Sequence, residues 1–280
     1  MKNNKKIIVV AGATATGKTA KAIELATQYE TSILSFDSRQ CYNELNIGVA
    51  KPTKEELQLV PHYFINSHSI NSNMNVALFE KYALTVVNKL FETNNVIIAV
   101  GGTGLYLNAL RNGVDAIPSI PTILTERLLH QYNELGINWL KNEIQQLDKS
   151  YTNLNDLNNA HRMLRALAVV MHTGNSIRQY QLHTPVTRQF DVELNVLHVE
   201  RTELYQRINN RVDNMIAMGL IAEVEKLQPH QHLNALQTVG YTELFDYYNG
   251  KINLPTAIAL IKQHTRNYAK RQITWFKKLA

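Results

Sequence analysis

Short apolar runs, separated by longer amphipathic segments, divide the chain and predict buried β-strands. They span residues 7–11, 32–36, 96–100 and 194–199. Apolar residues recur at helical spacing over 18–29, between the first two runs, and over 77–91, before the third. Repeated strand, helix, strand units predict an α/β fold, with a parallel sheet that carries helices on both faces.

The stretch between the third and fourth apolar runs has a different character. Its apolar spacing predicts three helices, at residues 122–135, 139–147 and 157–172. We therefore predict a helical insertion at residues 113–189, within a core domain formed by residues 1–112 and 190–280. From residue 203 on, the pattern is again mostly helical. Insertions of this kind typically form a lid or a second lobe over a site.

The composition is that of an ordinary α/β protein. The 280 residues, 45% of them hydrophobic, suit one domain with an insertion. Cys41 is the only cysteine, so an intrachain disulfide is excluded. The basic start, residues 1–6, precedes an apolar segment that is too short for a signal peptide or a membrane span. We expect a cytoplasmic monomer that does not bind membranes.

Basic residues gather toward the end of the sequence. The formal net charge is +6 and the pI about 9.2. No acidic residue follows Asp246, whereas seven lysines and arginines do: Lys251, Lys262, Arg266, Lys270, Arg271, Lys277 and Lys278. Tyr268, Trp275 and Phe276 are interleaved with them. This pattern fits either a helix with a solvated basic face and an aromatic core face, or a stripe that contacts nucleic-acid phosphates.

Residues Gly12–Thr19 match the phosphate-binding loop pattern, a glycine, four residues, then Gly-Lys-Thr. A predicted strand precedes the loop and a predicted helix follows it, as the pattern requires. Backbone N–H groups and the helix N-terminus would attract an anion. Lys18 would reach the terminal phosphate oxygens, and the Thr19 hydroxyl would hold Mg²⁺. Taken alone, the loop predicts nucleotide binding, with ATP as the common ligand.

Two further strand ends are predicted to lie beside this loop. Asp37 follows the second strand, and the glycine-rich turn Gly101–Tyr106 follows the third. Ligands of open parallel sheets bind at the carboxyl ends of the strands. There Asp37 could bind magnesium, act as a general base or cap the following turn, and the Thr103 hydroxyl would point into the same cleft. Three converging strand ends predict a site.

Eight further motifs follow the phosphate loop along the chain. They are Asp37-Ser38-x-Gln40-x-Tyr42, Ile47-Gly48-x-Ala50-Lys51-Pro52-Thr53, Pro61-His62-Tyr63, Gly101-Gly102-Thr103-Gly104-Leu105-Tyr106, Arg162-x-x-Arg165-Ala166-Leu167, Arg207-Ile208-x-x-Arg211-Val212-Asp213, Val239-Gly240-Tyr241 and Lys270-Arg271-Gln272-x-Thr274-Trp275-Phe276. In this order, and with the phosphate loop, the set resembles the tRNA dimethylallyltransferases, the tRNA isopentenyltransferase family, nearly end to end.

The resemblance implies a P-loop NTPase-like fold with an inserted helical tRNA-binding domain. It implies transfer of a dimethylallyl group from dimethylallyl diphosphate to N6 of an adenosine, with release of diphosphate. The acceptor it implies is adenosine 37, adjacent to the anticodon, in tRNAs that read codons beginning with U.

The resemblance also implies roles for individual residues. Asp37 would be the general base on the exocyclic amine, and Thr103 would position that amine and the diphosphate. With Mg²⁺, the diphosphate would be bound by Gly12, Ala13, Thr14, Ala15, Thr16, Gly17, Lys18, Thr19 and Arg211. The tRNA anticodon stem-loop would contact Asp37, Ser38, Arg39, Gln40, Thr103, Thr125, His161, Arg162, Met163, Leu164, Arg165, Gly240, Tyr241, Lys270, Arg271 and Trp275.

Four positions depart from the family pattern. Family members usually carry glutamine at His161, glutamate at Ala168, aspartate at Asn66 and arginine at Thr125. The predicted catalytic groups are all present, so these departures bear on tRNA recognition.

Other polar residues are not expected to take part in the chemistry. The spacing of the histidines along the chain does not match that of zinc ligands. Glu223 falls on a predicted helix, where we expect a solvated or ion-paired role.

Three other functions compete with this interpretation. A small-molecule kinase also places a phosphate loop on a short parallel sheet and would transfer the terminal phosphoryl group of ATP. A prenyltransferase of the same fold would use free AMP as its acceptor. A tRNA-binding protein without catalysis is the third. The insertion and the aromatic-basic segment favour a macromolecular acceptor, and Asp37, Thr103 and Lys18 favour an enzyme.

Overall fold

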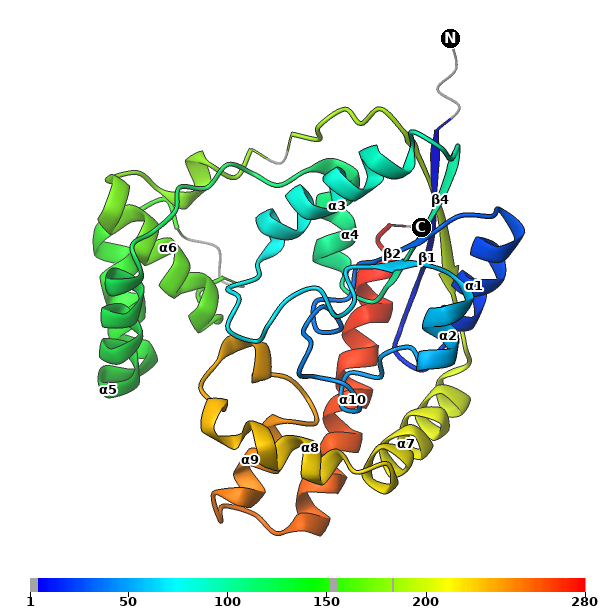
Figure 1. Cartoon of the computed structure of the whole chain (residues 1–280). Helices are drawn as coiled ribbons and strands as arrows, with labels where there is room; N and C mark the ends of the chain where they lie inside the picture. Colours follow the sequence, from blue (N-terminus) through cyan, green and yellow to red (C-terminus); the bar gives the residue numbers. More distant parts are fainter. Residues whose placement is uncertain (1–4, 152–155, 183, 280) are drawn as a thin grey trace. The chain divides into compact units, whose positions relative to one another are not determined.

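A computed structural model describes residues 5–151, 156–182 and 184–279 (Figure 1). The basic start, residues 1–6, therefore lies partly outside the described residues. Along the chain the elements are β1 (Lys6–Gly12), α1 (Lys18–Gln28), β2 (Ile33–Ser35), α2 (Lys54–Leu59), β3 (His62–Tyr63), α3 (Val76–Leu90), β4 (Val96–Gly101), α4 (Gly104–Asn112), α5 (Thr122–Leu147), α6 (Ala160–Thr173), β5 (Asp191–Leu197), α7 (Arg201–Ala217), α8 (Leu220–Leu227), α9 (Thr242–Tyr248) and α10 (Leu254–Phe276). Three short 3₁₀ helices lie at Ile177–Gln179, Gln228–His230 and Asn234–Leu236.

The five strands form one parallel sheet in the order β3-β2-β4-β1-β5. Alternate residues of β1 face opposite sides, as the pleat of a strand requires. Ile7 and Val9 pack into a cluster with α3 and α4, whereas Ile8 and Val10 pack with α1 on the other face. Figure 1 shows these helices on the two sides of the strands. The structure thus confirms the predicted α/β fold, with a parallel sheet and helices on both faces.

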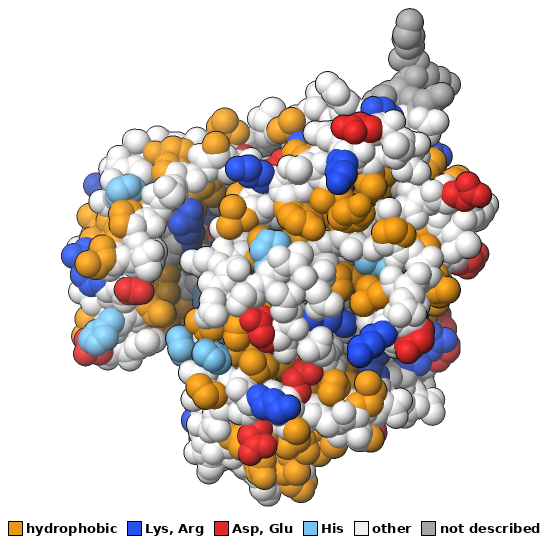
Figure 2. Space-filling model, viewed as in Figure 1, with side chains coloured by type: hydrophobic (Ala, Val, Ile, Leu, Met, Phe, Trp, Pro, Cys, Tyr) orange, Lys and Arg blue, Asp and Glu red, His pale blue; other side chains and the backbone are white. Residues whose placement is uncertain are grey.

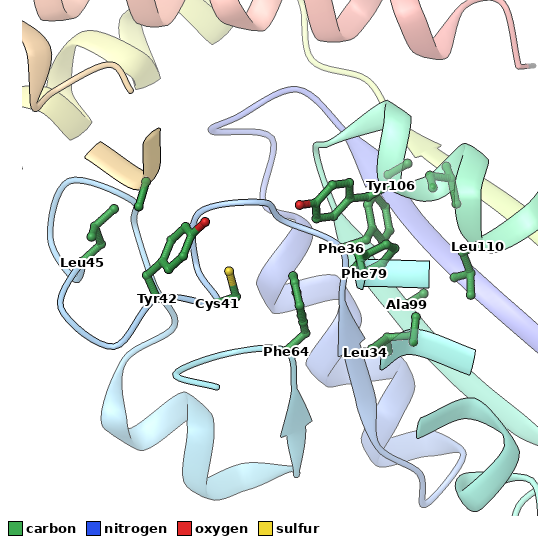
Figure 3. Close-up of a cluster of buried hydrophobic side chains, with 14 of the residues drawn as sticks. Leu34, Phe36, Cys41, Tyr42, Leu45, Phe64, Phe79, Ala99, Tyr106 and Leu110 are labelled. Carbon is green, nitrogen blue, oxygen red and sulfur yellow. The ribbon is translucent and has the colours of Figure 1, made fainter. Parts of the chain in front are cut away.

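Several aromatic side chains pack together in the core between the sheet and helices α3 and α4 (Figure 3). The rings of Phe79 and Tyr106 stack with their centroids 4.2 Å apart, and Phe64 meets Phe79 edge-on at 5.0 Å. Burial of each such side chain stabilises the fold by about 1.5–3 kcal/mol. Because Tyr106 lies in the first turn of α4, this packing also holds the turn between β4 and α4 in place.

The fourth predicted strand differs from its expected form. β5 spans Asp191–Leu197, begins three residues before the predicted run 194–199, and pairs only with β1. It is an edge strand, so the prediction that it is buried was wrong. Val196 is 37% exposed and Leu194 only partly buried. The two-residue strand β3, at the opposite edge, was not predicted because His62–Tyr63 has no apolar run.

The chain divides into two compact units, Met1–Gly113 with Val186–Ala280, and Val114–Pro185. Residues 186–189, which we predicted as part of the insertion, bond to the first unit. The Val186 N–H donates to the Asn112 carbonyl at 2.8 Å, and Arg188 pairs with Glu80 at 2.5 Å. These contacts explain why the second unit ends four residues before position 189.

The second unit is helical and has its own core. Helices α5 and α6 pack through buried residues that include Leu140, Ile144 and Leu167. Gly136, with φ 75° and ψ −173°, breaks the helical backbone inside α5, which accounts for the two separate helices predicted there. Over the described ranges of the whole chain, no helix combines the length and the apolar character needed to cross a membrane.

Candidate active site

The phosphate loop, Asp37 and Thr103 lie at the carboxyl ends of three neighbouring strands. β1 lies beside β4, with Ala11 paired to Gly101, and β4 lies beside β2. The turn after β2 is joined directly to the turn after β4, because the Ser38 N–H donates to Thr103 Oγ1 at 3.1 Å. The structure therefore brings together the three strand ends that the sequence analysis placed in one cleft.

The backbone of the phosphate loop has an unusual conformation. Gly12 has a φ of 149°, and a Cβ atom there would lie 2.9 Å from the Leu197 carbonyl oxygen. Ala15 has a φ of 65°, the left-handed region that costs an L-residue roughly 1–3 kcal/mol. The Thr16 hydroxyl closes the loop by donating to the Ala13 carbonyl at 2.8 Å. No side chain caps the start of α1 at Gly17, so its first N–H groups are available to an anion.

Two cationic side chains approach this loop from different elements. Lys18, in the first turn of α1, donates to the Ala13 carbonyl at 2.6 Å. Arg211, on α7, donates to the Thr14 hydroxyl at 3.3 Å. Burial lowers the pKa of Lys18 to about 8; the Asp37 carboxylate opposes this shift and Arg211 adds to it. Burial also lowers the pKa of Arg211.

Neither cation forms an ion pair with a carboxylate among the residues that the structure describes. Desolvated positive charge without a directly paired carboxylate is costly, and a bound anion relieves that cost. The arrangement can therefore hold a phosphate or diphosphate group between Lys18, Arg211 and the loop N–H groups.

Asp37 uses one carboxylate oxygen to hold its own turn. Oδ1 accepts hydrogen bonds from the backbone N–H groups of Arg39, at 2.9 Å, and Gln40, at 3.3 Å. This is the capping role, one of the three that the sequence left open. No hydrogen bond from a described residue reaches Oδ2, so the second oxygen can serve as a base as well. Burial raises the pKa of the nearby Tyr268 phenol to about 12, and the charge of Asp37 contributes to that shift.

The side chains of Arg39 and Gln40 are engaged within the protein. The Arg39 guanidinium donates to the carbonyls of Asn234, at 2.8 Å, and Gln237, at 3.3 Å. The Gln40 amide donates to the Ala50 carbonyl at 3.0 Å. Beside this turn is a cavity of about 470 Å³, whose lining includes Ser38, Arg39, Gln237, His264, Tyr268 and Arg271. Arg39 therefore forms part of the wall of this cavity, whereas Gln40 ties its turn to the loop that carries Ala50.

Glu223 ties two loops together, a role that the sequence analysis missed. Its carboxylate accepts from the N–H groups of Ile47, at 2.8 Å, and Gly48, at 3.2 Å, and from the Tyr241 hydroxyl at 2.6 Å. The sequence analysis predicted a solvated or ion-paired role for Glu223 and did not predict these hydrogen bonds. Tyr241 is fully buried, and burial raises the pKa of its phenol. We assign Tyr241 a supporting role, in place of the direct tRNA contact predicted for it.

The basic residues of α10 fall into two groups. Lys251, just before the helix, pairs with Asp246 at 2.8 Å, and Lys262 pairs with Asp213 at 2.6 Å. Lys270 and Arg271 are exposed and form no ion pair within the described part of the chain, and Trp275 beside them is 40% exposed. The face shown in Figure 2, by contrast, mixes charges of both signs. The second half of α10 thus carries the available positive charge, together with an exposed aromatic ring.

Six of the predicted tRNA contacts lie in the helical unit, Val114–Pro185. His161, Arg162 and Arg165 are exposed on α6, and Leu164 is partly buried. Met163 is fully buried, so it supports this surface and does not form part of it. Arg162 pairs with Asp156 at 2.7 Å. Thr125, on α5, donates its hydroxyl to the Thr122 carbonyl at 2.8 Å.

Two of the family departures have visible structural settings. Ala168 is buried in the core of the helical unit. Asn66 accepts a hydrogen bond from Lys51, and burial lowers the pKa of Lys51 to about 8. An aspartate at position 66 would give Lys51 a charged partner, which asparagine does not.

The residues at the loop fit a magnesium ion that arrives with a diphosphate. The Thr19 hydroxyl is a hard oxygen donor, in the first turn of α1, and it makes no hydrogen bond to a described residue. Among the described residues, no three histidine, cysteine or acidic side chains gather into a metal site. Mg²⁺ commonly takes few protein ligands and completes its shell with water and substrate phosphates.

A protein-family model described as IPP transferase matches residues 40–279. The chain is 44% identical over 278 residues to a tRNA dimethylallyltransferase of Flavobacterium psychrophilum, which covers 97% of this chain and 91% of that protein. It is 41% identical over 275 residues to a tRNA dimethylallyltransferase of Cytophaga hutchinsonii, with 98% and 90% covered.

The chain is also similar to solved structures of tRNA prenyltransferases. A tRNA isopentenylpyrophosphate transferase from Bacillus halodurans matches with a TM-score of 0.71 and 33% identity, over 98% of this chain and 87% of that one. A eukaryotic dimethylallyltransferase acting on tRNA matches with a TM-score of 0.77 and 27% identity, over 97% and 69%. With its phosphate loop at the end of a parallel sheet and these matches over nearly the full chain, the protein belongs to the IPP transferase family.

Proposed function

We propose that this protein transfers a dimethylallyl group from dimethylallyl diphosphate to N6 of adenosine 37 in tRNAs that read codons beginning with U. The observation that carries the proposal is that two cationic side chains lie at one strand end of the site and a carboxylate lies at another. Lys18 and Arg211 lie at the phosphate loop after β1, and neither forms an ion pair with a carboxylate among the described residues. Asp37, with its free oxygen Oδ2, follows β2, which is separated from β1 in the sheet by β4. Such a site suits an anionic leaving group on one side and a weakly acidic amine on the other.

The reaction needs both halves of this arrangement. The exocyclic amine of adenine is a poor nucleophile, because its lone pair is delocalised into the ring. As the new C–N bond forms, Asp37 Oδ2 takes the amine proton. The C–O bond to the donor breaks at the same carbon, and the diphosphate leaves with its electron pair. Lys18, Arg211 and the N–H groups of the loop stabilise the charge that develops there.

Two further conditions follow from the substrates. A base stacked in an RNA loop is out of reach, so the adenosine must leave its stack to meet Asp37. An allylic carbon tolerates positive charge, so water must be excluded from the site. Mg²⁺, held by the substrate phosphates and Thr19, would supply additional neutralisation of the leaving group.

One experiment tests the proposed activity directly. The protein is incubated with labelled dimethylallyl diphosphate, Mg²⁺ and unmodified tRNA, and the RNA is digested to nucleosides. We expect label in a prenylated adenosine. Label on AMP but on no tRNA would show that the acceptor is wrong. Turnover of ATP without a prenyl diphosphate would favour the kinase.

Binding of tRNA is expected to weaken steeply as salt rises, since phosphate contacts by α10 release counterions. The double variant Lys270→Ala with Arg271→Ala should flatten a plot of log affinity against log salt by about 0.7–0.9 per lost contact. Lys251→Ala is the matched control, because Lys251 already pairs with Asp246 and should change the slope little. If the wild-type plot is flat, α10 does not bind phosphates.

A further inference from the structure

A buried glutamine on α10 joins the two halves of the candidate site. Gln272 is 5% exposed. Its Oε1 accepts a hydrogen bond from the Thr14 N–H at 2.8 Å, within the phosphate loop. Its Nε2 donates to the Gly102 carbonyl at 2.9 Å, in the turn that carries Thr103. One side chain thus spans the gap between the loop and the turn.

The chemistry of this bridge is specific to an amide. One end must accept and the other must donate, and the amide of glutamine offers both at a fixed separation. A glutamate could accept from Thr14 but could not donate to Gly102 in its ionised form. A methionine would fill similar space and would leave both backbone groups without their partner.

Gly102 has no side chain and thereby leaves room for the Gln272 amide. A Cβ atom on Gly102 would lie 2.1 Å from Gln272 Nε2, far inside contact distance. Its next neighbours would be at 3.3 Å, also in Gln272, and at 3.5 Å, the Gly12 carbonyl oxygen. The φ of Gly102 is outside the left-handed region. The need for glycine at this position therefore comes from Gln272 and not from the backbone.

We propose that Gln272 is a positioning residue that sets the spacing between the diphosphate loop and the Thr103 turn. It would thereby set the distance from the donor's reacting carbon to the acceptor amine. The inference rests on the proposed function. Prenyl transfer requires donor and acceptor within about 3–3.5 Å in line, and a misplacement of 1 Å costs on the order of 100-fold in rate.

Gln272→Met is the first test, with Gln263→Met as control, because Gln263 is exposed on the same helix. The readouts are kcat, KM for dimethylallyl diphosphate, the Kd of inorganic diphosphate and Tm. We expect kcat of Gln272→Met to fall about 100-fold, and its Kd for diphosphate to rise by about fivefold, the effect of one lost hydrogen bond. Gln263→Met should match the wild type in all four. Wild-type kcat in a folded Gln272→Met would overturn the proposal.

A double-mutant cycle separates positioning from general stability. Gly102→Ala should lower kcat about as much as Gln272→Ala, because the new methyl group displaces the glutamine. In the double variant the methyl group has room, so kcat should be no lower than in Gln272→Ala alone. If the two losses multiply, Gly102 and Gln272 act independently and the inference falls.

The same variants distinguish the two proposals. A wild type that prenylates no tRNA would overturn the proposed function. The double-mutant cycle can also be measured as the Kd of inorganic diphosphate, which needs no acceptor. That cycle would still decide whether Gln272 positions the loop. Non-additive changes in Kd would support that role, and additive ones would contradict it.

Discussion

Asp37→Asn is expected to lower kcat by about 10²–10⁴-fold, the usual contribution of a general base. The substitution is selective, because asparagine keeps an oxygen in place of Oδ1. That oxygen can still accept from the N–H groups of Arg39 and Gln40, so the turn is preserved. What is lost is the proton acceptor at Oδ2. The measurement is single-turnover transfer of labelled dimethylallyl to tRNA.

Two comparisons make this result interpretable. Asp37→Ala removes both the base and the cap, so it should be no more active than Asp37→Asn and should also have a lower Tm. Asp246→Asn is the control for loss of an acidic residue, since Asp246 is exposed to solvent in a pair with Lys251. If Asp37→Asn transfers normally and Asp37→Ala does not, Asp37 is only a turn cap.

Lys18→Met is expected to weaken transfer by about 10²–10³-fold, because it removes the charge nearest the leaving diphosphate. The side chain is partly buried at the start of α1, and methionine approximates its stem. The loss should appear in both kcat/KM for the donor and the Kd of inorganic diphosphate. Lys21→Met, one turn along the same helix, removes an exposed lysine that pairs with Glu24 and should change neither quantity.

The pKa of Lys18 adds a pH dependence to the same prediction. Burial lowers that pKa to about 8 in the free protein, and a bound diphosphate favours the charged form. Above pH 8 the free protein has lost the Lys18 proton, so Lys18 must take up a proton when diphosphate binds. The affinity for diphosphate should therefore fall above about pH 8, by up to tenfold per pH unit. The folding stability changes with pH in the opposite direction to the affinity for diphosphate. Burial of the charge costs stability below pH 8, and this cost is relieved as pH rises from 8 toward 10.5.

In Lys18→Met this pH dependence of diphosphate binding should disappear between pH 8 and 9. Isothermal titration with inorganic diphosphate at several pH values measures it. A wild-type affinity that does not change across this interval would show that Lys18 stays charged in the free protein, or does not contact the diphosphate.

The sequence predicted those parts of the fold that depend on local pattern. Buried runs such as residues 7–11 became strands because each is covered on both faces and flanked by turn residues. The phosphate loop was recognisable because its spacing, glycines and flanking elements all lie within one short segment. Convergence of Asp37 and Thr103 followed from a general rule of parallel sheets. β5 was misjudged because apolar content alone does not separate an edge strand from a central one.

The rest of the site depends on partners that are distant in the chain. Glu223 looked like a surface residue of a helix, yet its partners lie 175–177 residues earlier. The burial of Tyr241 has the same origin, because its hydroxyl bonds to that carboxylate. The only local signal was the glycine at position 48, which leaves room for a close neighbour. Periodicity and spacing describe a segment by itself, so such pairings have to be read from the folded chain.

The bond between Thr14 and Gln272 links residues that are 258 positions apart. A ribosome adds about 5–20 residues per second, so the loop is made roughly 13–50 s before its glutamine partner. During that interval the nascent chain has the sheet's first strand and the loop sequence, but not the side chain that holds Thr14. An unfinished chain therefore lacks a complete diphosphate site and should not hold the prenyl donor there while synthesis continues.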